Sequence, residues 1–319
     1  MSEIKVVILD DRYSDYGQEE TVLAELGVKP EIHWPKSEDD AAMILHDADA
    51  VICNLYPLTG DLIRGMKKCR VISRYGVGYD NVDVEAASEM GIVVCNVPDY
   101  AMEDASDHAL ALLFGCIRKI SYRDRMIRQG KWNLHQDQPC FRMAGRVLGV
   151  IGYGHIGSTL VRKISGFGFS RILVDDPRAD ESRIRAAGGE KASLEDVLRY
   201  SDYISIHCPL KAETKNMFDS KAFSMMKDGA ILINTARGPI VNDEELYKAL
   251  VRGKLAAAGL DVYSEDPLSL DSPLRTLENI TLTDHAAWYS EESIIELKTK
   301  AARNVIEVLN GKEPSYRVN

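Results

Sequence analysis

The fold of this chain is decided by residues 146–157, which read RVLGVIGYGHIG. The first six of these residues form an apolar run that is typical of a buried strand. Glycines then follow with G-x-G-x-x-G spacing, and a helical pattern of apolar residues continues to Ile164. A second apolar run, 172–174, ends at Asp175 and Asp176. A strand, this glycine motif, a helix, a second strand and an acid, in that order, are typical of a dinucleotide-binding unit.

Each part of the motif has a physical role in holding a dinucleotide. Gly152 permits the tight turn, Gly154 lets the backbone approach a pyrophosphate, and Gly157 lets the helix pack closely on the strand. The helix then presents free N–H groups and the positive end of its dipole to the phosphates. The sequence therefore predicts a bound dinucleotide cofactor, against the alternative of a glycine-rich turn without a ligand.

The acid at the end of the second strand is expected to bind the adenosine ribose. Asp176 precedes Pro177 and ends the strand, so we favour Asp176 over Asp175. Two adjacent carboxylates would repel a 2′-phosphate, which favours NAD over NADP, although Arg178 lies close enough to weaken that argument.

Composition narrows the class of protein. The chain has 319 residues, enough for two domains, and a formal net charge of −10, which disfavours nucleic acid as a partner. It has no apolar run long enough to span a membrane, and no room for a signal peptide before its first strand, so we expect a cytoplasmic protein without a membrane partner. None of its six cysteines has C-x-x-C spacing. We expect buried free thiols and no metal.

Residues 4–98 form a second α/β pattern that lacks the glycine motif. Short β-branched runs at 6–9, 50–53, 70–73 and 92–95 alternate with helical patterns, including 61–68 and 83–90. We assign residues 1–98 with 292–319 to a substrate domain that ends in a long helix, about 291–310. Residues 99–291 are assigned to the NAD-binding domain. Within it, 118–145 is an irregular stretch that we expect to be an arm packing on a second subunit; a surface loop closing over the site is the alternative.

The predicted fold class is α/β, with two doubly wound parallel-sheet domains. The larger is a Rossmann NAD-binding domain and the smaller is a flavodoxin-like substrate domain. After the glycine motif, further strands are expected at 203–208, 230–234, 257–262 and 280–283. Together with the two strands of the motif they make a sheet of at least six strands, if residues 188–192 contribute little.

Polar side chains that could carry chemistry follow three of these strands. Arg237 lies in the segment Asn234–Gly238, where a guanidinium could clamp a carboxylate at two points. His285 ends a strand and could carry a proton. A carboxylate of the loop 261–267 could hold the other nitrogen of that imidazole and favour its charged form. The loop 74–81 carries two glycines whose backbone N–H groups could hold a small anion, or it is simply a tight turn.

Motifs spread over residues 75–288 resemble the D-isomer-specific 2-hydroxyacid dehydrogenase family. They are YGVGYDNVD (75–83), NVP (96–98), GYGHIG (152–157), HCPL (207–210) with Thr214, NTARG (234–238) and His285. The resemblance implies that Arg237 orients the substrate carboxylate and that His285 is the proton donor. It also implies that the backbone of Val77 and Gly78 holds the carboxylate and that Asp261 binds the nicotinamide carboxamide. The cofactor groove would be lined by residues of the matching motifs, namely Gly152, Tyr153, Gly154, His155, Ile156, Gly157, Asp176, His207, Cys208, Pro209, Thr214, Thr235, Ala236, Arg237, Asp261 and His285.

One position departs from the family pattern. The family usually has glutamate as the partner of the catalytic histidine, just before the proline of this loop, whereas this chain has Asp266 preceded by Glu265. We expect Asp266 to partner His285 and keep Glu265 as the alternative. The segment 285–291 is most similar to the branch that contains the C-terminal-binding-protein corepressors. Trp288 could form an apolar wall beside the substrate side chain, or it could pack beneath the final helix. Tyr56 lies in an early loop that we expect to contact the substrate.

These features predict an NAD(H)-dependent enzyme that interconverts a small 2-keto acid and a D-2-hydroxy acid, and we expect it to be a homodimer. Relatives of the hydroxypyruvate, glyoxylate or phosphoglycerate type are implied by the resemblance. The early loop 54–57 has no arginine, which lowers the expectation of 3-phosphoglycerate as substrate. The alternative function is an NADH-sensing, corepressor-like scaffold with little turnover.

Overall fold

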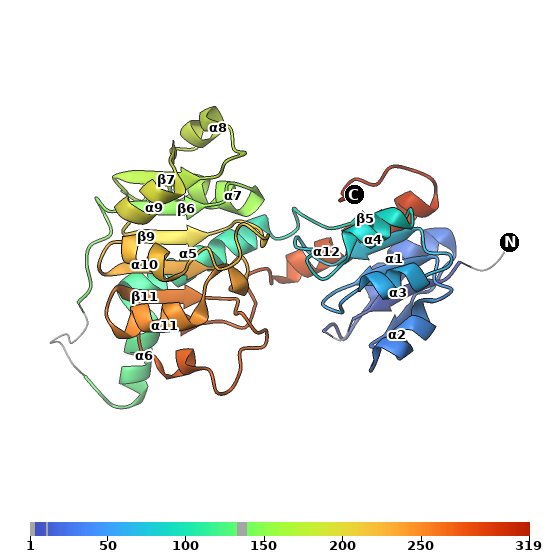
Figure 1. Ribbon diagram of the computed structural model, residues 1–319, viewed down its shortest axis with the longest axis horizontal. Coiled ribbons are helices and arrows are strands. Elements are labelled where there is room, and N and C mark those ends of the chain that lie inside the picture. Colours follow the sequence, from blue (N-terminus) through green and yellow to red (C-terminus); the bar gives the residue numbers. More distant parts are fainter. Residues whose placement is uncertain (1–3, 11, 133–138) are drawn as a thin grey trace. The chain divides into compact units, whose positions relative to one another are not determined.

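The computed structural model describes residues 4–10, 12–132 and 139–319. The chain divides into two compact units. Unit 1 is Met1–Tyr100 with Ser290–Asn319, and unit 2 is Ala101–Tyr289. Figure 1 shows the elements of each unit.

Unit 1 is a five-stranded parallel sheet with strand order β2-β1-β3-β4-β5, the flavodoxin-like order. Its strands are β1 (Val6–Leu9), β2 (Glu31–His33), β3 (Ala50–Cys53), β4 (Val71–Arg74) and β5 (Val93–Cys95). Its helices are α1 (Gly17–Leu23), α2 (Glu38–Leu45), α3 (Gly60–Gly65), α4 (Val84–Glu89) and α12 (Glu291–Leu309), with a 3₁₀ turn η1 (Ala24–Leu26). The sequence analysis did not predict β2, because this short edge strand is largely exposed and has no apolar run to reveal it.

Helix α12 returns the end of the chain to unit 1. It begins with a capping box, in which the side chains of Ser290 and Ser293 each bond the other's backbone N–H. After its last turn Gly311 has φ +72°, the left-handed conformation that commonly ends a helix. The buried stripe of α12 includes Leu297, Ala301 and Val305, and it contacts β3 and β4.

Unit 2 is a seven-stranded parallel sheet with strand order β12-β11-β10-β9-β6-β7-β8, the Rossmann order extended by one strand. Its strands are β6 (Val147–Ile151), β7 (Arg171–Asp175), β8 (Glu190–Lys191), β9 (Tyr203–Ile206), β10 (Ala230–Asn234), β11 (Leu255–Leu260) and β12 (Ile280–Leu282). The sheet has the six predicted strands and a seventh, β8, in the region 188–192, where Glu190 and Lys191 pair with Leu173 and Val174. Both residues of β8 are exposed, so no apolar pattern marked this edge strand.

Helices cover both faces of the sheet in unit 2 (Figure 1). They are α5 (Met102–Arg118), α6 (Ile120–Arg128), α7 (His155–Ile164), α8 (Glu181–Ala186), α9 (Leu194–Tyr200), α10 (Ser220–Met225) and α11 (Asp243–Val251), with 3₁₀ turns η2 (Gly238–Ile240) and η3 (Pro273–Thr276). The buried side chains of α5 and α7 form one apolar core with Leu148 and Val150. Those of α9, α10 and α11 form a second core, which Ile151 joins from the opposite side of β6. The motif strand is therefore buried on both faces, as its apolar run predicts.

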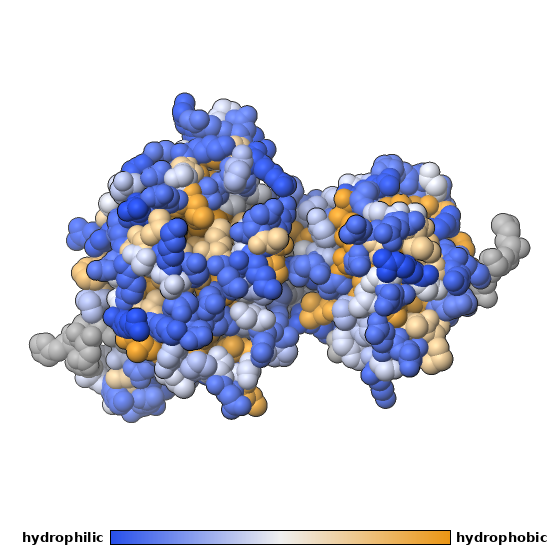
Figure 2. All heavy atoms as spheres, in the orientation of Figure 1, coloured by the Kyte–Doolittle hydropathy of each residue, from blue (hydrophilic) through white to orange (hydrophobic). Residues whose placement is uncertain are grey.

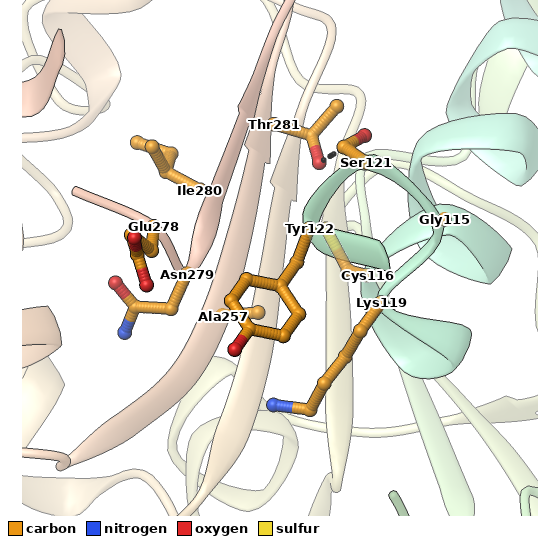
Figure 3. Close-up of a pocket in the computed structure, with 10 residues that line it drawn as sticks. All are labelled: Gly115, Cys116, Lys119, Ser121, Tyr122, Ala257, Glu278, Asn279, Ile280 and Thr281. Carbon is orange, nitrogen blue, oxygen red and sulfur yellow. Dashed lines mark hydrogen bonds between the residues drawn. The ribbon is translucent and has the colours of Figure 1, made fainter. Parts of the chain in front are cut away.

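Part of the predicted arm is regular rather than irregular. Helix α6 lies within 118–145 and packs against the edge of the sheet, where Ser121 bonds Thr281 at 3.2 Å (Figure 3). Residues 133–138 of the arm lie outside the described residues. A crevice of about 20 Å³ opens beside α6, with Lys119, Tyr122 and Asn279 at its rim (Figure 3). It lies at the amino ends of β11 and β12, whereas the predicted chemistry lies at the carboxyl ends.

The surface is dominated by hydrophilic side chains, with apolar residues scattered between them on the face that Figure 2 shows. No helix among the described residues is long and apolar enough to cross a membrane. All six cysteine thiols are free; Cys53, Cys95 and Cys116 are buried and Cys140 is exposed.

Candidate active site

The loop after β6 contains two glycines that the fold requires and a third at which a side chain would meet no neighbouring atom. Gly152 has φ +93°, and a Cβ there would lie 2.5 Å from the backbone nitrogen of Cys208. A Cβ on Gly157 would lie 2.1 Å from the carbonyl oxygen of Gly152. By contrast, a Cβ on Gly154 would meet nothing within 4 Å. Gly154 is the exposed N-cap of α7, so its lack of a side chain keeps open the space where a phosphate would approach the helix.

The acid at the end of β7 that contacts the glycine loop is Asp176. Its Oδ2 accepts a hydrogen bond from the backbone N–H of Tyr153 at 2.8 Å, and its Oδ1 accepts one from that of Arg178 at 2.9 Å. These bonds hold the carboxylate beside the glycine loop. Burial and the charge of Asp176 raise the pKa of the neighbouring Asp175.

The segment after β9 lies against the same loop. The backbone N–H of His207 donates to Ile151 at 2.7 Å, and its Nε2 lies 2.8 Å from Ser205 Oγ. Burial lowers the pKa of His207 to about 4, so its ring is neutral near pH 7. Burial raises the pKa of Cys208 to about 11, which keeps it a thiol. The hydroxyl of Thr214 shapes its own loop, donating to Pro209 O at 2.7 Å and accepting from Lys211 N–H at 2.8 Å.

The turn that carries Arg237 is held by Asn234, the buried last residue of β10. The amide of Asn234 donates to the carbonyl of Arg237 at 2.9 Å and accepts from the N–H of Ala236 at 3.0 Å. Next to it, a Cβ on Gly238 would lie 1.8 Å from the carbonyl carbon of Tyr263, so this glycine permits the turn to pack on the loop after β11. Thr235 Oγ1 is buried and has no hydrogen-bond partner among the described residues.

His285 lies beside Asp266, with Nδ1 2.5 Å from Oδ2. Both side chains are partly exposed, at 21% for His285 and 32% for Asp266. Because the carboxylate is an acceptor, Nδ1 carries the hydrogen and Nε2 is left for another partner. Glu265 is exposed. Of the two acids that the sequence left open, Asp266 is therefore the one in contact with the imidazole.

Asp261 holds the backbone around His285. His285 has φ +58°, a left-handed conformation that costs energy in a residue other than glycine. The carbonyl of Asp261 accepts from the N–H of His285 at 2.9 Å. Its fully buried carboxylate accepts from the N–H groups of Ala286 and Ala287, each at 2.9 Å. Three consecutive N–H groups are thus held by one residue.

Thr283 also bonds Asp261, and the sequence analysis did not single it out. Its Oγ1 donates to Asp261 Oδ1 at 2.6 Å. The hydroxyl of Tyr263 donates to the carbonyl of Thr283 at 2.5 Å, and burial raises the pKa of Tyr263 to about 12. The sequence offered no signal for these contacts, because neither a threonine nor a tyrosine at a strand end marks a particular partner.

The remaining predicted residues lie elsewhere. Trp288, in unit 2, packs edge-on against Tyr289, with ring centroids 5.9 Å apart. In unit 1, Tyr56 Oη donates to Ser37 O at 3.3 Å, and its ring stacks edge-on with Trp34. Val77 is exposed, and its carbonyl accepts from the amide of Asn96 at 2.7 Å.

The fold and the site of unit 2 define a dinucleotide-dependent oxidoreductase, and comparison with known proteins agrees. Residues 110–287 match the model of the D-isomer specific 2-hydroxyacid dehydrogenase, NAD binding domain. The chain is 39% identical over 277 residues to a glyoxylate reductase of Korarchaeum cryptofilum, covering 86% of this chain and 83% of that one.

Solved structures give the same result over the whole chain. A glyoxylate reductase from Paecilomyes thermophila has a TM-score of 0.90 at 26% identity and covers 100% of this chain and 99% of its own. A D-lactate dehydrogenase from Aquifex aeolicus, in complex with NAD and lactic acid, has a TM-score of 0.89 at 26% identity, covering 98% and 99%. This chain belongs to the D-isomer-specific 2-hydroxyacid dehydrogenase family.

The residues of unit 2 fit a bound NAD. The open space at Gly154 leads to the N-terminus of α7, where backbone N–H groups can bind phosphate. Asp176 stands at the strand end where a ribose acceptor is needed. The buried hydroxyl of Thr235 lacks a partner among the described residues, so a cofactor group could satisfy it.

Proposed function

We propose that this chain is an NADH-dependent reductase of a small 2-keto acid, with His285 as proton donor and Arg237 as carboxylate anchor. The observation that carries the proposal is the contact between Asp266 and His285 at the carboxyl end of the sheet that bears the glycine loop. When bound, NADH supplies the hydride that reduces the carbonyl carbon. The protein must then hold the acid and deliver one proton to the carbonyl oxygen.

His285 is suited to deliver that proton. Asp266 accepts from Nδ1–H and so fixes the orientation of the ring, which leaves Nε2–H as the proposed donor toward substrate. In the oxidative direction the same nitrogen accepts the proton of the hydroxyl group. The partial exposure of the ring allows the proton to be replaced from water after each turnover.

Arg237 is suited to hold the carboxylate. Nη1 donates to the carbonyl of Ala236 at 2.8 Å, which orients the guanidinium on its own turn. The Asn234 amide fixes that turn, and the packing of Gly238 on Tyr263 fixes its position against the loop that leads to Asp266. A planar guanidinium offers two parallel N–H groups to a carboxylate, which positions the substrate as well as attracting it.

The substrate we favour is small, of the glyoxylate or hydroxypyruvate type. Support comes from the name of the Korarchaeum cryptofilum relative. Trp288 beside the catalytic strand end is proposed to limit the size of the substrate side chain. We propose separately that the backbone N–H groups of Val77 and Gly78 in unit 1 bind an anionic group and that Tyr56 contributes to the same function. Gly76, with φ +121°, makes the sharp turn of that loop possible.

We also propose that segment 118–145 mediates a homodimer. Four large apolar side chains on this segment are exposed in the single chain: Ile120 (58%), Ile127 (54%), Trp132 (81%) and Phe141 (60%). Exposed apolar side chains gathered on one segment are typical of a contact surface. Light scattering of the purified protein tests this, and a monomer at micromolar concentration would contradict it.

The experiment that tests the activity follows NADH absorbance with a panel of 2-keto acids: glyoxylate, hydroxypyruvate, a bulky apolar keto acid and phosphohydroxypyruvate. We expect oxidation of NADH with the small acids. His285→Ala should abolish turnover while NADH still binds, as measured by quenching of protein fluorescence. Turnover retained by His285→Ala would overturn the role of His285. Tight NADH binding without turnover on any acid would instead favour the corepressor-like alternative.

A further inference from the structure

His108 is a polar residue on α5 that approaches the catalytic strand end from the neighbouring helix. Its side chain is 23% exposed. Its Nε2 lies 3.0 Å from Thr283 Oγ1 and 3.4 Å from Asp261 Oδ1. Asp261 holds the backbone around His285, and Thr283 donates a hydrogen bond to Asp261.

The direction of the hydrogen bonds in this cluster follows from the groups present. The hydroxyl of Thr283 has one hydrogen, and the 2.6 Å contact places it on the carboxylate of Asp261. The Thr283 oxygen must therefore accept from His108, so Nε2 of His108 carries a hydrogen. The result is a chain of donors that runs from His108 through Thr283 to Asp261. Such chains strengthen each member because each bond polarises the next.

This series of hydrogen bonds ends on the carboxylate of Asp261, which holds the backbone around His285. Burial alone would raise the pKa of Asp261, but the nearby His108 ring and the hydrogen bonds from Thr283 and the two backbone N–H groups outweigh burial and hold its pKa below the ordinary value. The carboxylate is thus charged and buried; it accepts from Thr283, just after β12, and from the backbone of residues 286–287, and His108 of α5 lies 3.4 Å away. Loss of one donor would leave a buried charge less well compensated and its other bonds looser.

We infer that His108 is a positioning residue for the reaction: through Thr283 and Asp261 it holds the left-handed backbone that aims His285. This inference rests on the proposed role of His285 as proton donor. It predicts that the donor at Nε2, rather than the bulk of the ring, is what the site needs. Glutamine can place an N–H₂ donor near the position of Nε2, whereas leucine fills similar space without a donor.

The test compares His108→Leu with His108→Gln in the full-length protein. We expect His108→Leu to lower kcat about tenfold with little change in the KM of the keto acid, since one hydrogen bond to a charged network is lost. We expect His108→Gln to restore kcat to within about threefold of the wild type. The control is Asp107→Asn, which breaks the neighbouring exposed pair with Lys163 and should leave kcat unchanged.

Amide hydrogen exchange gives a readout that does not depend on turnover. The N–H groups of residues 285–287 should exchange faster in His108→Leu than in the wild type, and at the wild-type rate in His108→Gln and Asp107→Asn. Unchanged exchange in His108→Leu would overturn the inference whether or not the protein is a dehydrogenase. If the N–H groups exchange faster in His108→Leu but the wild-type protein reduces no keto acid, the result would support the positioning role and overturn the proposed function instead.

A double-mutant cycle with Thr283→Val completes the test. If His108 acts through Thr283, the combined variant should lose no more kcat than Thr283→Val alone. Additive losses would overturn the relay, as would equal kcat in the leucine and glutamine variants. Should His108→Leu fail to fold, Thr283→Val takes its place in the kcat and exchange measurements. Wild-type values in that variant would again overturn the inference.

Discussion

Nδ1 of His285 lies 2.5 Å from Oδ2 of Asp266, although the two residues are 19 positions apart in the chain. The contact joins the loop after β11 to the end of β12, two neighbouring strands of the unit 2 sheet. Through this direct contact the carboxylate orients the imidazole that we propose as the proton donor.

Asp266→Asn should lower kcat/KM about a hundredfold, because an amide accepts from Nδ1–H less strongly than a carboxylate does and so orients the proposed proton donor less firmly. Steady-state reduction of the best keto acid measures the effect. The matched control is Glu265→Gln, which changes the adjacent exposed acid and should keep kcat/KM within about twofold of the wild type. A larger loss in the control than in Asp266→Asn would show that Glu265 is the working partner.

Gly154→Ala and Gly157→Ala should separate the glycine that serves the ligand from the glycine that serves the fold. A Cβ on Gly154 meets no atom within 4 Å, so Tm should be unchanged while NADH binds at least about tenfold more weakly. A Cβ on Gly157 would press on the Gly152 carbonyl, and we expect about 1–3 kcal/mol of destabilisation. Gly166→Ala, also in open space, is the control for both. Thermal unfolding without cofactor and NADH titration measure the two effects, and equal NADH affinity in Gly154→Ala would contradict the proposed approach of the phosphates.

Arg237→Lys should lower kcat/KM about a hundredfold, because an ammonium group cannot make the two parallel bonds that a guanidinium makes to a carboxylate. The loss should be smaller for a 2-keto amide analogue, which lacks the carboxylate charge. Arg252→Lys, at an exposed position at the end of α11, is the control and should behave as the wild type. An equal loss for the acid and the amide would indicate that Arg237 acts elsewhere than on the carboxylate.

The stability of the protein should fall between pH 6.5 and pH 4 because of His207. Its folded pKa, about 4, lies below the ordinary value of 6.5, so the unfolded chain binds a proton more readily in this window. The contribution of His207 is therefore fully present above pH 6.5 and is lost as the pH falls, by at most about 3 kcal/mol. Thermal unfolding without cofactor should show a smaller drop in Tm between pH 7 and pH 4.5 for His207→Gln than for the wild type. The exposed His46, changed to Gln, is the control; an equal drop in all three proteins would contradict this prediction.

Local patterns were sufficient to predict both sheets and the nucleotide-binding loop. The apolar runs that became β6 and β7 are buried on two faces, so their composition alone distinguishes them from edge strands. The glycines at 152 and 157 occupy positions where a Cβ would strike backbone atoms, a constraint that acts over a few residues and therefore shows in the sequence. By contrast, β2 and β8 are exposed edge strands held by backbone pairing, which carries no side-chain signal.

The site divides in the same way. Arg237 and His285 could be singled out because each follows a predicted strand, and the carboxyl ends of parallel strands meet at one edge of a sheet. The choice between Glu265 and Asp266 could not be made from the sequence, since adjacent residues of a loop point in different directions that only the folded backbone sets. The link from His108 to Asp261 joins a helix to a strand end across more than 150 residues, and no local pattern records it. The sequence by itself determined the fold class and the cofactor loop, and it predicted the side chains that we propose as catalytic, because the strands and the glycine loop depend on short-range periodicity and backbone sterics. Only the tertiary structure decided that Asp266 contacts His285 and that Asp261 is bonded by Thr283, which His108 contacts in turn. Those bonds depend on distances between segments far apart in the chain.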